Sequence, residues 1–69
     1  MMETINDRIR IGQRIAELRK EKGMTQAQLA EQACVLQPNI ARIENGRYGI
    51  TIDVLARIAE ALGKRIDLV

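Results

Sequence analysis

The stretch TQAQLAEQACVLQPNIARIENG, residues 25–46, contains two short helical patterns separated by only three residues. Thr25 and Gln28 fit a capping box, in which each side chain satisfies a backbone N–H group at the start of a helix. The apolar positions that follow are spaced for one helix face, and they are Leu29, Ala30 and Ala33. These features predict a first short helix over about residues 26–33.

A second short helix is predicted to run to about Glu44. Pro38 suits a first helical turn, where its missing N–H group is not needed, and it pushes Gln37 toward extended geometry. Ile40 and Ile43 recur at helical spacing and are expected to face the core. The outer side would then present residues that a core helix does not need: Gln37, Pro38, Asn39, Ala41 and Arg42.

Two longer helical patterns flank this stretch. The first is predicted over about residues 4–22, and Gly23 after its cationic last turn is a stop signal. Thr51 is expected to cap the last helix, which Gly63 closes. The tail KRIDLV, residues 64–69, alternates charged and apolar residues as a strand does, and the same tail of a second subunit is its economical partner. An irregular tail is the alternative.

Length and composition indicate one small domain, residues 1–69. Cys34 is the only cysteine and histidine is absent, so one chain can form neither an internal disulfide nor a Cys/His zinc site. The sequence has no glycine-rich phosphate loop, no metal-ligand cluster and no apparent base for Cys34. We therefore expect no cofactor, no metal and no enzymatic activity.

The net charge of +2 permits nucleic-acid binding but does not argue for it. Residues 1–22 carry six Lys and Arg against four Asp and Glu, an excess that a solvated helix face would also explain. No apolar run is long enough to cross a bilayer, and the first residues lack an apolar signal region. A soluble cytoplasmic protein is the resulting prediction.

Two short helices joined by a tight connection describe a helix-turn-helix. The stretch resembles the motif of the phage-repressor-like family, also called XRE or Cro/CI-type, and IGQRIAELRKEKGMTQ and IDVLARIAEALG resemble its first and later helices. The resemblance covers about residues 11–63 and is carried in register by Gln26, Leu29, Ala30, Val35, Gln37, Ile40, Ile43 and Glu44-Asn45-Gly46. It implies a compact all-α domain of four to five helices with its motif at about residues 25–44, with or without a C-terminal strand that pairs between subunits.

The resemblance also implies roles for single residues on double-stranded DNA, with the second short helix in the major groove. The base-reading positions are Gln37, Pro38, Asn39 and Arg42. The positions that contact phosphate or support the reading residues are Gln26, Asn45 and Arg47. Gln and Asn side chains can pair with adenine, and Arg can pair with guanine. A structural ion pair is implied between Arg19 and Glu44. The alternatives are that these polar side chains are merely solvated, that Asn39 caps its helix, or that Arg42 pairs with a carboxylate.

The sequence departs from the family pattern at the turn. Cys34 replaces a glycine whose left-handed backbone costs other residues roughly 1 kcal/mol, so the turn either tolerates this cost or relaxes to another geometry. Leu36 replaces a small hydroxyl residue, so either a capping bond is lost or Gln37 becomes the cap. Tyr48, the only aromatic residue, is expected to pack over the last helix.

These expectations favour a sequence-specific transcriptional regulator, a repressor that acts as a homodimer on a palindromic operator. Its two reading helices would lie about 34 Å apart on one face of the duplex. The alternative is an antitoxin or transcriptional adaptor whose main task is to bind another protein, such as a toxin.

Overall fold

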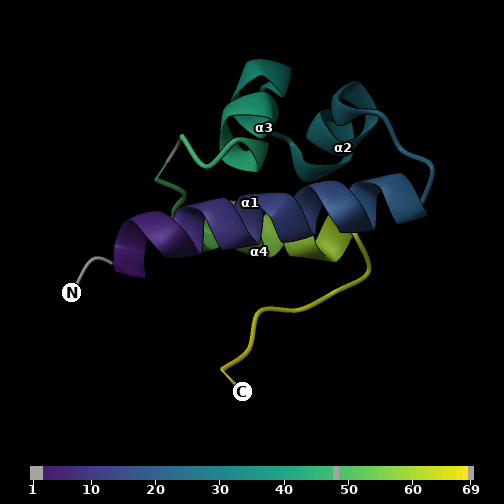
Figure 1. Ribbon diagram of the computed structural model, residues 1–69. Coiled ribbons are helices and arrows are strands. Elements are labelled where there is room, and N and C mark those ends of the chain that lie inside the picture. Colours follow the sequence, from purple (N-terminus) through teal and green to yellow (C-terminus); the bar gives the residue numbers. More distant parts are fainter. Residues whose placement is uncertain (1–2, 48, 69) are drawn as a thin grey trace.

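The computed structural model describes residues 3–47 and 49–68 of the chain and shows an all-α architecture (Figure 1). Its four helices are α1 (Glu3–Glu21), α2 (Gln26–Ala33), α3 (Gln37–Glu44) and α4 (Ile52–Ala61), and the described residues contain no strand. The all-α class and the bounds of the helices agree with the sequence prediction to within one or two residues. None of the described helices is long and apolar enough to span a membrane.

The two short helices lie together on one side of α1, and α4 runs behind α1 (Figure 1). α2 packs against both α3 and α4, while α1 packs against α3. The chain after α4 leaves on the side of α1 that is opposite to α2 and α3 (Figure 1). This arrangement leaves the outer side of α3 free of other helices.

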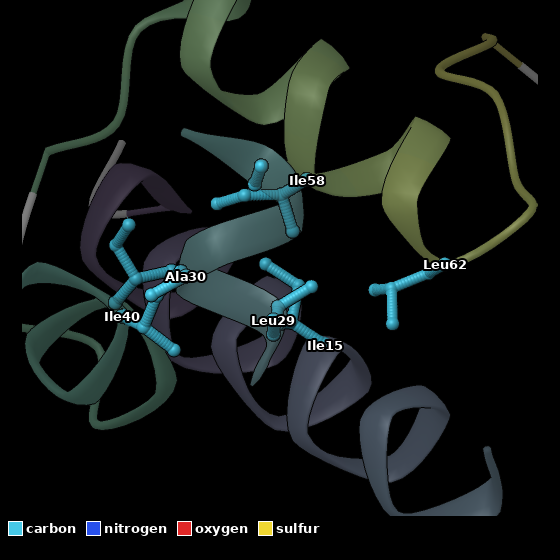
Figure 2. Packing of buried hydrophobic residues seen from close by; sticks show 8 residues of the cluster. Ile15, Leu29, Ala30, Ile40, Ile58 and Leu62 are labelled. Atoms are coloured by element: carbon cyan, nitrogen blue, oxygen red, sulfur yellow. The ribbon is translucent and has the colours of Figure 1, made fainter. Parts of the chain in front are cut away.

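The core takes side chains from every helix. Its buried members are Ile15, Leu29, Ala30, Ala33, Ile40, Ile43, Ile58 and Leu62. Figure 2 shows Leu29 of α2 pointing into the space between α1 and α4, and Ala30 lying beside Ile40 of α3. Burying a large aliphatic side chain of this kind contributes roughly 1.5–3 kcal/mol, so the core fixes α3 against α2.

Ile9 of α1 is more exposed than its position in the helical spacing would indicate. The spacing places Ile9 on the apolar stripe of the first helix, but it is 42% exposed. Its neighbour is the segment after α3, since a Cβ atom added at Gly46 would lie 2.8 Å from Ile9 Cγ1, and this segment covers Ile9 only in part. A repeat along one helix predicts which residues share a face, but it cannot show how far the covering helices reach.

The starts of α2 and α4 are capped by threonine as predicted. The Gln28 backbone N–H donates to Thr25 Oγ1 at 3.1 Å, and the Thr25 N–H donates to Gln28 Oε1 at 2.8 Å, which completes the capping box. The Val54 N–H donates to Thr51 Oγ1 at 3.2 Å. These bonds satisfy N–H groups that the first turn of a helix leaves without a partner.

The turn between α2 and α3 keeps a left-handed backbone even though cysteine stands at the turn position. Cys34 has φ 57° and ψ 46° and is exposed. The N–H group of Val35 donates to the Ala30 carbonyl at 2.9 Å, which closes the end of α2. A non-glycine residue therefore forms the tight turn that sets the angle between the two short helices.

Residues 64–68 form neither helix nor strand within the single chain, as the irregular-tail alternative expected. The tail borders an apolar groove with α1 and α4, and Leu18 and Leu62 are among the residues that line it. Leu68 is 97% exposed. Pairing of this tail with a second copy stays a prediction, and the expected packing of Tyr48 lies outside the described residues.

Candidate functional site

The outer side of α3 is the candidate site, because it is a polar surface on a helix whose inner side is buried in the core. Ile40 and Ile43 on the inner side are buried. Gln37, Pro38 and Arg42 are exposed, as expected for the reading positions. The helix has eight residues and is therefore about 12 Å long. Gln37 and Arg42 thus lie along one short helix that the major groove of B-DNA, about 12 Å wide, can admit.

Asn39 is less open than the sequence interpretation supposed, since it is partly buried. Its side-chain oxygen accepts a hydrogen bond from Arg42 Nη1 at 3.3 Å. Asn39 does not cap the helix, because the cap position is Leu36. Among the described residues, the Arg42 guanidinium has no carboxylate within ion-pair distance. Arg42 therefore keeps most of its hydrogen-bonding capacity for a ligand outside the chain.

An ion pair ties α3 to α1. Arg19 Nε donates to Glu44 Oε2 at 2.7 Å, and Arg19 Nη2 donates to Glu44 Oε1 at 3.1 Å. The remaining Nη1 of Arg19 donates to the Met24 carbonyl at 2.8 Å. The two charged side chains are only 11% and 6% exposed. Planar pairing of this kind fixes geometry as well as charge, so it restrains the position of α3.

Gln26 joins the same network, because its Nε2 donates to Glu44 Oε1 at 3.0 Å. The resemblance implied that Gln26 supports Gln37 and meets phosphate. The structure brings its amide nitrogen to Glu44 and leaves the side chain partly buried, and the phosphate contact stays a prediction. With Arg19 on its other side, the Glu44 carboxylate is neutralised, so it opposes an approaching phosphate less than a free carboxylate would.

Asn45 and Arg47 follow the end of α3 and are both exposed. The Arg47 N–H donates to the Arg42 carbonyl at 2.9 Å, and Gly46 between the two residues has φ 71°. The chain therefore bends back over the last turn of α3. This bend places the two predicted phosphate-contacting residues at the end of α3 that is opposite to Gln37.

Gly12 positions α3, and the sequence interpretation missed it. A Cβ atom added at Gly12 would lie 2.2 Å from the Ile43 carbonyl oxygen, far inside van der Waals contact. The glycine therefore lets α1 and α3 approach backbone to backbone. A glycine within an otherwise helical pattern was the signal that could have revealed this contact.

Arg57 is a second positioning residue that the sequence interpretation missed. From α4, its Nε donates to the Ala33 carbonyl at the end of α2, at 3.1 Å. Nothing in the sequence distinguishes Arg57 from the other arginines, so this contact could not be predicted. No group of His, Cys, Asp and Glu that could hold a metal occurs within the part of the chain that the structure describes.

One family model and two sequence relatives match this chain. The family model described as Helix-turn-helix matches residues 15–69. The immunity repressor protein of Bacillus phage phi105 is 41% identical over 59 residues, covering 86% of this chain and 41% of the repressor. An HTH-type transcriptional regulator of Methanothermobacter thermautotrophicus is 46% identical over 50 residues, covering 72% of each chain. The chain thus spans less than half the length of the phage repressor.

Solved structures agree with these sequence relatives. The restriction-modification controller protein C.AhdI from Aeromonas hydrophila superposes with a TM-score of 0.84 at 28% identity, over 87% of this chain and 91% of that one. The clp gene regulator ClgR from Corynebacterium glutamicum gives a TM-score of 0.82 at 30% identity, over 86% of this chain and 76% of that one. The fold is therefore one that regulators of different genes use.

Proposed function

The chain belongs to the XRE, or Cro/CI-type, helix-turn-helix family of DNA-binding transcriptional regulators, and from this premise we propose that it is a sequence-specific repressor. The observation that carries the proposal is the outer side of α3, where exposed Gln37 and Arg42 project from a helix that α1 and α2 hold in place. Such a helix can enter the major groove with its N-terminal residues at the base edges.

In this proposal, Gln37 pairs with adenine and Arg42 with guanine, each through two hydrogen bonds. Each such contact contributes about 1–3 kcal/mol of discrimination against a wrong base. Asn39 supports Arg42 through the hydrogen bond between their side chains rather than reading a base independently. Pro38 shapes the start of the helix that approaches the bases.

The phosphate contacts fall to Asn45 and Arg47 at the far end of α3. Gln26 takes a supporting role, because its amide nitrogen is bonded to Glu44. Gly12 and the Arg19–Glu44 pair contribute by fixing α3 before DNA arrives, so that binding does not have to order it. Regulators in this family that read two half-sites gain affinity when two domains are linked, because the second contact becomes intramolecular.

We propose that the tails of two copies pair as antiparallel strands to form the homodimer. If Ile66 lies on the two-fold axis, each Arg65 stands opposite Asp67 of the other copy. Opposite charges at directly facing strand positions stabilise a sheet. The tail leaves the molecule on the side away from α3, so pairing there keeps both reading helices free for a palindromic site (Figure 1).

A protein partner such as a toxin is the second candidate, and the exposed apolar side chains of the tail favour it. Leu68 is 97% exposed and Ile66 is 38% exposed, beside the apolar groove between α1 and α4. This surface also lies on the side opposite to α3, so it could be occupied while DNA is bound. If binding such a partner is the main task, substitutions at Gln37 and Arg42 should leave that complex intact.

The test is binding to the DNA just upstream of the protein's own gene, with excess competitor DNA and over a range of salt concentrations. The proposal predicts binding that survives the competitor, with a slope of log K against log salt of about −0.9 for each phosphate neutralised. Binding no tighter than to competitor, also for DNA selected from a random pool, would contradict sequence-specific recognition. A neighbouring small protein that co-purifies would then favour the second candidate.

A further inference from the structure

Leu36 is an exposed aliphatic residue at the start of the helix that carries the reading surface. It is the N-cap residue of α3, with φ −66° and ψ 138°, and it is 72% exposed. It directly precedes the exposed Gln37. An isolated exposed leucine is ordinary in itself, so the significance of Leu36 depends on its position.

The corresponding position in the other capped helices is threonine. In α2 and α4, the N–H group of the third helical residue donates to the hydroxyl of Thr25 or Thr51. In α3, the N–H group of Asn39 donates instead to the Leu36 backbone carbonyl at 2.9 Å, and Leu36 makes no side-chain cap. A capping hydroxyl is thus absent at the helix start that is expected to meet DNA bases. Departures of this kind from local rules concentrate at functional positions.

We infer that Leu36 packs against the 5-methyl group of a thymine next to the base that Gln37 reads. This inference rests on the proposed function, since it requires α3 to enter the major groove. The first residues of such a helix lie at the base edges. Thymine is the base that presents a methyl group there, and an aliphatic side chain with no donor or acceptor is suited to contact that group. Leu36 thereby becomes a specificity-determining residue in addition to the hydrogen-bonding side chains.

The test begins with DNA that the wild-type protein selects from a random pool. Each thymine of the selected site is then replaced by deoxyuridine, one symmetric pair at a time, which removes the methyl group and keeps every hydrogen-bonding atom. Wild type should lose about fourfold in affinity for each half-site at one such position, because a buried group of this size contributes about that factor. The Leu36→Ala variant should bind thymine and uracil versions of that site equally.

Ile52→Ala is the matched control, because Ile52 is also exposed, at 74%, but lies at the start of α4. This variant should keep the full preference for thymine. Circular dichroism of Leu36→Ala and of Leu36→Ser shows that each variant is folded before its affinity is compared.

Two results would overturn the inference while leaving the proposed function in place. One is a selected site whose affinity is unchanged by every uracil replacement, and the other is an undiminished thymine preference in Leu36→Ala. A pool that yields no enriched sequence would contradict the proposed function itself, and the inference would fall with it.

Discussion

Glu44 of α3 accepts two hydrogen bonds from the Arg19 guanidinium of α1, across 25 positions of sequence. The same carboxylate accepts a third bond from the Gln26 amide of α2. One side chain therefore joins the three helices that determine where the outer side of α3 points. Because the pair is largely buried, removing one partner leaves the other charge without compensation.

Glu44→Gln should accordingly lower the free energy of unfolding by about 3 kcal/mol, the usual cost of breaking a buried ion pair from one side. Glu17→Gln is the matched control, since Glu17 pairs with Arg14 on the surface of α1 and both side chains are more than half exposed. The control should change stability by no more than about 0.5 kcal/mol. Urea unfolding followed by circular dichroism measures both. Equal losses in the two variants would show that the buried network does not hold α3.

Gly12→Ala should destabilise the protein by about 3 kcal/mol, although alanine is intrinsically the better helix former by about 1 kcal/mol. The new methyl group would collide with the Ile43 backbone carbonyl and push α3 away from α1. Gly49→Ala is the control, because its nearest neighbour is the flexible end of the Arg8 side chain at 3.0 Å. Thermal unfolding of the two variants distinguishes them. A Gly12→Ala protein as stable as wild type would mean that the two backbones are not in close contact.

Leu36→Ser should raise the stability by about 0.5–1 kcal/mol, because the hydroxyl supplies the cap that α3 lacks. The same change should weaken binding to the selected DNA, since it removes the side chain inferred to contact thymine. In one preparation of the variant, urea unfolding should therefore show a higher free energy of unfolding, while DNA titration shows a lower affinity. A variant that is less stable than wild type would contradict the account of this helix start.

Arg65→Asp and Asp67→Arg should each weaken the homodimer by placing like charges opposite each other in the paired tails. The double variant exchanges the two charges and should restore dimerisation. Sedimentation equilibrium over a range of concentrations measures the effect. Three variants that all dimerise as wild type does would exclude the antiparallel pairing centred on Ile66.

The sequence predicted local structure well, because its signals are local. The capping box at Thr25 and the exposure of Gln37 follow from residue type and short-range spacing. The sequence left the turn at Cys34 open, because a non-glycine residue disfavours the left-handed backbone that the structure shows there. The ion pair between Arg19 and Glu44 came from the family resemblance rather than from spacing, and its contacts are present in the structure.

The other features of the site depend on how the helices pack against one another, and a local sequence pattern does not predict this packing. The close approach at Gly12, the partial burial of Asn39 and the bond from Arg57 to α2 arise from contacts between distant segments. The hydrogen bond from the Gln26 amide to Glu44 also joins residues of different helices, and the sequence did not predict it. The sequence could identify polar residues near the site but could not assign their partners.

The most direct test of sequence reading by α3 is the affinity of the Gln37→Ala/Arg42→Ala double variant for DNA that the wild type selects. Arg10→Ala is run beside it, because it also removes an exposed arginine but from α1, where Arg10 pairs with Asp7. Loss of two contacts worth about 1–3 kcal/mol each predicts that the double variant binds at least about 30-fold more weakly, while Arg10→Ala stays within a few-fold of wild type. A folded double variant that binds the selected DNA as tightly as wild type would contradict the account.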